Sequence, residues 1–247
     1  MMKTIKILTV MLLLISGISS YASGSMYQRD QRSGALNIDN GYFSFTLFPG
    51  HMFPVWIKNA GGIGLPPCRF LDRITFLKGG PAYFLDMDLY AETVILADTP
   101  ERLLIEKRGT YCDNPQHAAP GNIRVTYAYL IERGKPYVTL TMTLARDNEE
   151  PAEVRFFHPA WSGATPWHEV IMPEGKNFAV GRGDGVTDEM YGPVQHLSLK
   201  NDSLTLQVSG VVRFFCNRFN HNSFLLGGIK DVWKSRELTM QVTFTVK

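Results

Sequence analysis

The clearest pattern in this sequence is a strict alternation of polar and apolar positions across residues 136–146. There, Thr139, Thr141 and Thr143 are each flanked by apolar residues, a period of two that is typical of a strand with two different faces. Residues 125–132 alternate in the same way just before it, and the link between the two runs contains Gly134 and Pro136. The pattern therefore predicts an antiparallel hairpin.

Shorter stretches of strand-like composition continue along the chain. They lie at residues 42–48, 68–76, 82–90, 94–97, 103–107, 153–158, 197–200, 203–208, 211–216, 223–229 and 237–246. No window shows a helical stripe longer than two turns, and 22 glycines and 14 prolines interrupt the chain. We predict an all-β protein, a large antiparallel β-sandwich, formed by one domain over residues 35–247. Residues 23–34 are small and polar, which predicts a flexible leader.

One interval, residues 159–193, lacks this regular pattern. It contains Trp161, Trp167, His168, Glu169 and Arg182 together with six glycines. A long glycine-rich excursion in a β protein often carries function. A carbohydrate site requires aromatic rings that stack on the C–H faces of a sugar and planar polar groups that bind its hydroxyls. We therefore expect Trp161, Trp167, Glu169 and Arg182 to bind substrate, although His168 and Glu169 would point to opposite faces of a strand.

The first 22 residues have the pattern of a secretory signal peptide. Lys3 and Lys6 precede an apolar run at residues 7–15, and Ser20 and Ala22 fit the −3 and −1 positions of a cleavage site. The run is shorter than the roughly 18 apolar residues of a membrane-spanning helix. We expect cleavage near Ala22 and a secreted or periplasmic protein with no integral membrane segment after cleavage.

Charge and cysteine content narrow the possible partners. The chain has 25 basic and 23 acidic residues, and removal of Lys3 and Lys6 with the signal peptide leaves equal numbers. A neutral chain lacks the basic surface that nucleic acid requires, so we expect no nucleic-acid partner.

Cys68, Cys112 and Cys216 form no C-x-x-C pair, and we interpret them as core thiols with one possible disulfide. No metal or nucleotide motif is present, so no cofactor and no metal are predicted.

Three segments have distinctive patterns. Residues 127–136 carry the pattern Y-x-Y-x-I-x-x-G-x-P and are followed by an alternating strand, residues 38–45 contain Asn40-Gly41, and residues 233–238 precede the last alternating strand. These segments resemble the central strands, the first strand and the closing segment of the galactose mutarotase-like supersandwich, as found in aldose epimerases and in glycoside hydrolases. The resemblance covers most of the chain after residue 34 and implies the same fold.

In aldose mutarotases of this superfamily, a histidine after a strand acts as general acid, and a late carboxylate acts as base. The resemblance places His158 at the matching strand end, but Pro159, Ala160 and Trp161 follow it in place of the usual residues. Asn217 falls near the position of the base, and an amide cannot take up a proton. His158 is therefore the one catalytic candidate, without its usual partner.

The sequence leaves three functional hypotheses open. The first is an exported carbohydrate-recognising domain of a polysaccharide-utilisation system, which binds an oligo- or polysaccharide on a concave sheet face. The second is an aldose-epimerase-like or polysaccharide-lyase-like enzyme with His158 as proton donor. The third is a non-catalytic cell-envelope module that binds another protein. Fold alone does not choose among them.

A further group of polar residues lies in turn-rich segments and could share one face. It consists of His51, Arg69, Asp113 and His117. His117 follows Asn114-Pro115-Gln116, a turn sequence that predicts an exposed position.

Overall fold

The computed structural model describes residues 24–49, 55–59, 69–76, 81–148, 152–162, 169–173, 177–179, 189–200, 205–216, 222–226, 232–233 and 235–247. Within them the chain is almost entirely antiparallel β-structure, arranged as a small sheet and a large one. Hence the predicted all-β sandwich class is confirmed.

The small sheet is built from the first part of the described chain. Its order is β1 (Tyr27–Arg29), β2 (Leu36–Asp39), β3 (Phe43–Leu47) and β4 (Val55–Asn59). The predicted flexible leader is therefore wrong for this segment, because β1 pairs with β2 and Met26 is buried. Asp30 stabilises the intervening turn, since its carboxylate accepts hydrogen bonds from the backbone N–H groups of Arg32 and Ser33.

The large sheet contains the remaining described strands. Its main path begins with β10 (His117–Ala118), β9 (Cys112–Asn114), β6 (Tyr83–Phe84), β5 (Arg69–Phe76), β13 (Ala152–Ser162) and β18 (Asn222–Leu226). It continues through β17 (Thr205–Cys216), β20 (Glu237–Val246), β12 (Tyr137–Ala145), β11 (Arg124–Glu132), β8 (Arg102–Thr110) and β7 (Glu92–Asp98). Beside this path, β14 (Glu169–Ile171) pairs with β15 (Asn177–Ala179) and β16 (Glu189–Lys200), and β19 (Val232–Trp233) pairs with β13.

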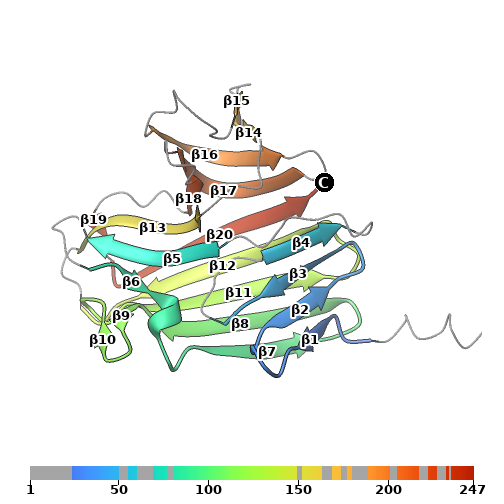
Figure 1. The fold of residues 1–247 in the computed structure, drawn as a ribbon, viewed down its shortest axis with the longest axis horizontal. Helices are drawn as coiled ribbons and strands as arrows, with labels where there is room; N and C mark the ends of the chain where they lie inside the picture. Colours follow the sequence, from blue (N-terminus) through green and yellow to red (C-terminus); the bar gives the residue numbers. More distant parts are fainter. Residues whose placement is uncertain are drawn as a thin grey trace, which may run out of the picture.

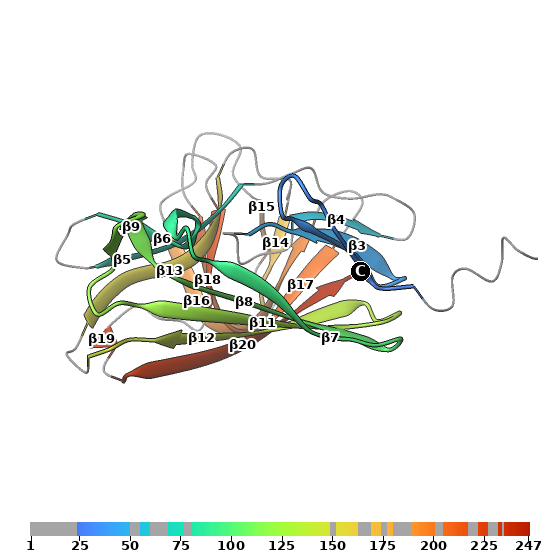
Figure 2. The same cartoon turned by 90° about the horizontal axis from the view of Figure 1, so that it is seen from below.

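The two sheets form a sandwich with one shared core. Figures 1 and 2 show β1–β4 lying across the strands β7, β8, β11 and β12, and Figure 2 shows the β5–β6–β9 end of the large sheet curving over to the same side. Phe43 and Phe45 of β3 belong to the same buried cluster as Tyr127 and Tyr129 of β11. Alternate positions of β11 and β12 are buried, as the sequence pattern predicts.

The predicted hairpin of β11 and β12 is confirmed, and its turn is also the place where the two sheets are tied together. Gly134 has a φ of 69°, the left-handed region that favours glycine in turns. Asn40 is completely buried, and its side-chain amide donates hydrogen bonds to the carbonyl oxygens of Glu132 and Lys135 at 3.1 and 2.8 Å. Its side-chain oxygen accepts from the backbone N–H of Tyr42 and of Phe43. This one side chain therefore fixes the start of β3 against the β11–β12 turn.

Two further strand predictions are corrected. Residues 82–90 form only the two-residue β6 and then a 3-10 turn, η2 (Leu85–Met87), because the Asp88 carboxylate accepts hydrogen bonds from nearby backbone groups and so competes with a strand. The stretches predicted at 203–208 and 211–216 are one continuous strand, β17. In the predicted excursion 159–193, residues 159–162 continue β13, and β14, β15 and the start of β16 also fall within it.

Candidate functional site

The structure gives the backbone positions of three of the residues predicted to act on carbohydrate. His158 and Trp161 lie in β13, opposite Arg73 and Phe70 of β5 respectively, and Trp161 also lies opposite Asn222 of β18. Glu169 opens β14, is partly buried, and pairs with Ala179 and Lys200. Trp167 and Arg182 lie outside the described residues, as does His168.

The alternation of positions along β13 separates its two candidate residues. The irregularity between β13 and β5 precedes Phe156, and from there the pairing is continuous to Ser162. Because successive strand positions alternate between the faces of a sheet, positions 158 and 161 fall on opposite faces. Position 161 shares its face with the position of Ile74, a fully buried core residue. One binding surface formed jointly by His158 and Trp161 is thus disfavoured.

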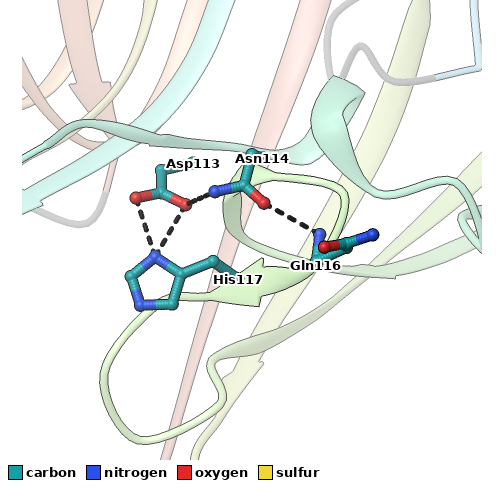
Figure 3. Close-up of polar contacts among 4 residues, drawn as sticks. All are labelled: Asp113, Asn114, Gln116 and His117. Atoms are coloured by element: carbon teal, nitrogen blue, oxygen red, sulfur yellow. Dashed lines mark hydrogen bonds and ion pairs between the residues drawn. The ribbon is translucent and has the colours of Figure 1, made fainter.

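A different group of polar side chains is brought together at the free end of the large sheet, on the hairpin of β9 and β10 (Figure 3). The turn is held by Asn114, whose side-chain oxygen accepts a hydrogen bond from the backbone N–H of Gln116 at 3.0 Å. The Asn114 amide also donates to Asp113 Oδ1 at 2.8 Å. Short polar side chains that bind their own backbone in this way are a common means of fixing turns.

Across this turn, Asp113 contacts His117. The Nδ1 atom of His117 lies 2.8 Å from both carboxylate oxygens of Asp113. The histidine side chain is 60% exposed, whereas that of Asp113 is 17% exposed. No other described polar group contacts the second ring nitrogen, Nε2. The hairpin therefore exposes the imidazole of His117 to solvent, and the largely buried carboxylate of Asp113 fixes the orientation of that ring.

Two buried residues, Tyr83 and Cys112, lie next to this pair. The ring of Tyr83 packs 6.2 Å from the His117 ring at an interplanar angle of 56°, and Tyr83 is itself buried. Burial raises the pKa of the Tyr83 hydroxyl, and the nearby charge of Asp113 raises it further. Burial also raises the pKa of the Cys112 thiol, with smaller contributions from Asp88 and Asp113. Both groups stay neutral at pH 7, and Cys112 is a free, buried thiol, as predicted for a core cysteine.

Chemically, this arrangement can bind a hydroxyl group and can move a proton. An imidazole whose other nitrogen is held by a carboxylate is the form used by acid–base histidines. A metal site lacks support in the described part of the chain, where no three His, Cys, Asp or Glu side chains are grouped as ligands. Likewise, no described helix is long and apolar enough to cross a membrane.

Sequence reasoning named Asp113 and His117 separately but did not pair them. The signal was present as an aspartate and a histidine four residues apart on either side of an Asn-Pro turn. Tyr83 was missed, since it lies about 30 residues away and only the pairing of β6 with β9 brings it to the hairpin. His51 lies outside the described residues, and Arg69 begins β5, opposite Ser162.

Comparison with solved structures identifies the fold. The structure matches an α-mannosidase from Enterococcus faecalis over 91% of this chain and 30% of that chain, with a TM-score of 0.61 and 6% identity. It matches a family GH36 α-galactosidase from Geobacillus stearothermophilus over 86% of this chain and 40% of that chain, with a TM-score of 0.54 and 10% identity. A galactose mutarotase-like protein from Lactobacillus casei is matched over 87% of this chain and 100% of that chain, with a TM-score of 0.52 and 10% identity.

The chain has a galactose mutarotase-like fold. The resemblance inferred from residues 38–45, 127–136 and 233–238 is thereby confirmed at the level of fold. No family model matches the sequence, and no curated protein matches it. The chain spans less than half the length of the two glycosidases, whereas it corresponds to the whole of the Lactobacillus casei protein. In the galactose mutarotase-like fold described above, the β9–β10 hairpin occupies one end of the large sheet.

Proposed function

We propose that this protein is an exported carbohydrate-recognising domain of a polysaccharide-utilisation system. The observation that carries the proposal is the shared fold: a sandwich covering 86–91% of this chain recurs in an α-mannosidase, an α-galactosidase and a mutarotase-like protein. Because a fold hosts many functions, the proposal also rests on the sequence, which places Trp161, Trp167, Glu169 and Arg182 in one glycine-rich interval.

Recognition is proposed in preference to catalysis for a chemical reason. The resemblance calls for a late carboxylate as base, but Asn217 lies near its expected position, and an amide cannot act as a base. His158 would then have to transfer protons without that partner. In this proposal Trp161 and Trp167 stack on sugar rings, while Arg182 and Glu169 bind hydroxyl groups.

Export is the second component of the proposal. It is supported by Lys3 and Lys6, the apolar run 7–15 and the small residues Ser20 and Ala22. Expression of the full chain with a C-terminal tag, followed by intact-mass analysis of the secreted or periplasmic fraction, is expected to give a protein that begins at Ser23. Recovery of only the uncleaved chain from the cytoplasm would contradict this part.

Binding is tested by affinity electrophoresis of residues 23–247 in native gels that contain one polysaccharide each. We expect selective retardation by one polymer, and weaker retardation of Trp161→Ala, with circular dichroism showing that this variant is still folded. Tyr42→Ala is the matched control, since Tyr42 is an exposed aromatic residue in the turn between β2 and β3. Retardation by no polymer would overturn the recognition proposal, and release of reducing ends or unsaturated products from the retained polymer would favour the enzymatic alternative.

A further inference from the structure

We propose that the β9–β10 hairpin is a glycan-contact site, in which Nε2 of His117 accepts a hydrogen bond from a hydroxyl group of an uncharged sugar and Tyr90 supplies a neighbouring ring. This inference rests on the proposed function, and it assigns the contact to residues outside the interval 159–193. Its basis is the geometry of Asp113 and His117 together with the exposure of Tyr90.

The first step is the tautomer of His117. An ionised carboxylate accepts hydrogen bonds and donates none, so the Nδ1 atom that lies 2.8 Å from both oxygens of Asp113 must carry a proton. In the neutral imidazole, Nε2 is then an acceptor. Asp113 thus fixes not only the direction of the ring but also the chemical character of its exposed nitrogen.

The second step is preorganisation. Asp113 Oδ1 also accepts from the Asn114 amide, and Asn114 in turn accepts from the backbone of Gln116, so the carboxylate is held by the turn itself. The buried ring of Tyr83 also packs against the imidazole. A ligand that meets a fixed side chain loses less conformational entropy on binding.

The third step is an exposed aromatic residue at the same end of the molecule. Tyr90 is 85% exposed and Leu89 is 73% exposed, in the turn between η2 and β7. The Asp88 carboxylate holds that turn, since it accepts from the backbone N–H of Tyr90 at 2.9 Å and from that of Thr110 at 2.6 Å. Thr110 ends β8 two residues before β9 begins, and η2 contacts β9. Figure 1 shows the η2–β7 turn and the β9–β10 hairpin at the same end of the molecule.

The charge of the site selects the class of sugar. Asp113 is the acidic partner of the pair, and a second carboxylate, that of Asp88, is held by the backbone of Tyr90 and Thr110 in the η2–β7 turn. A uronic acid would bring a carboxylate toward two others, which is unfavourable. Neutral sugar hydroxyls carry no such penalty and can donate to Nε2, while their C–H faces can stack on Tyr90. The site therefore fits an uncharged polysaccharide.

The test uses residues 23–247 in native gels with galactomannan, xyloglucan or mixed-linkage β-glucan, and with polygalacturonate as the anionic probe. We expect at least one neutral polymer to retard the wild type. His117→Ala and Tyr90→Ala should each bind that polymer with an affinity about fivefold lower, which corresponds to the loss of one net hydrogen bond or stacking contact. The control is His196→Ala, because His196 is an exposed histidine of β16, a strand that pairs with β14 and β17 and not with β9 or β10. That variant is expected to bind as the wild type does.

The outcomes separate this site from the proposed function. Retardation of the wild type with no loss in His117→Ala or in Tyr90→Ala overturns the hairpin site and leaves the recognition proposal standing. No retardation of the wild type by any polymer overturns both, and retardation by polygalacturonate alone overturns the neutral class. Independently, a ¹H–¹⁵N correlation spectrum of the imidazoles above pH 7 should show the Nδ1–H tautomer for His117, and the Nε2–H tautomer would overturn the site.

Discussion

The hydroxyl oxygens of Tyr111 and Tyr127 lie 2.8 Å apart, within hydrogen-bonding distance, and both side chains are completely buried. Tyr111 lies between β8 and β9, where its backbone N–H donates to the carbonyl oxygen of Ile123. Tyr127 belongs to β11, which lies between β12 and β8 in the large sheet. This hydrogen bond therefore connects β11 to the chain segment that leads into the β9–β10 hairpin.

We expect Tyr111→Phe and Tyr127→Phe each to lower the free energy of unfolding by about 1 kcal/mol, because each removes one partner of a buried hydrogen bond. The double variant should lose clearly less than the sum of the two, since the second substitution removes a bond already broken. Urea denaturation of the four proteins measures this coupling. Tyr90→Phe, at an exposed position, is the control and should change nothing, while strict additivity would argue against a shared bond.

Gly210 should be intolerant of any side chain. Its φ is +128°, and a Cβ atom at this position would lie 2.6 Å from the carbonyl oxygen of Gln241 in β20. We expect Gly210→Ala to lower the free energy of unfolding by about 2–4 kcal/mol, since backbone strain and the clash with a neighbouring strand add together. Thermal unfolding followed by circular dichroism measures the effect.

Gly134 provides the matched control for that prediction. It also has a positive φ, 69°, but an added Cβ would meet no atom within 4 Å. Gly134→Ala should therefore cost only the conformational strain, about 1 kcal/mol. Equal losses in the two alanine variants would show that the contact with Gln241 contributes nothing.

Asp147 should contribute to acid stability. Hydrogen bonds from Asn122 and Arg124 lower the pKa of its carboxyl below the usual 3.8 in the folded protein. The ionised form is thus favoured by folding, so the contribution is fully present above pH 3.8 and is lost as the pH falls through the lowered folded pKa. In Asp147→Asn, the free energy of unfolding should fall less steeply as the pH drops through that acidic window. Its dependence on pH near neutrality should be unchanged. Parallel acid-induced curves for the two proteins would contradict this.

The thiol of Cys112 should be unreactive in the native protein. Burial, and then the negative charges of Asp88 and Asp113, raise its pKa above the usual 9.0, so little thiolate exists at pH 8. Alkylation by iodoacetamide, followed by peptide mapping, should label Cys112 at the rate of global unfolding. Labelling as fast as that of a free peptide thiol would show that the β6–β9 region opens on its own.

Local pattern predicted the central hairpin well because β11 and β12 each present one face to the core over nine residues. The strands at the ends of the large sheet were harder to predict. β9 and β10 are three and two residues long, too short to show alternation, and their pairing depends on side-chain hydrogen bonds of Asn114 rather than on hydrophobicity. The turn at Asp88 interrupts a sequence that otherwise alternates, and its effect follows from a contact with Thr110.

The candidate site was predicted only in its parts. Residue types at positions 113 and 117 suggested polar chemistry, but their pairing follows from the turn that Asn114 and Gln116 make. The separation of His158 from Trp161 follows from the alternation of positions along β13, and its register with β5 decides which of the two shares a face with Ile74. Local sequence does not specify such a register, because a shift of one residue moves every side chain to the other face.

The position of β20 in the large sheet has a consequence for how the protein folds. This strand contains the last ten residues before Lys247, yet it lies between β12 and β17 in the sheet, about 100 residues from its partner β12. Closure of so long a loop is slow, and the two halves of the sheet are joined along the main path only when β20 is in place. Because β20 follows all the other described strands along the chain, a chain synthesised from its amino terminus can complete the main path of the sheet only after those strands have been made.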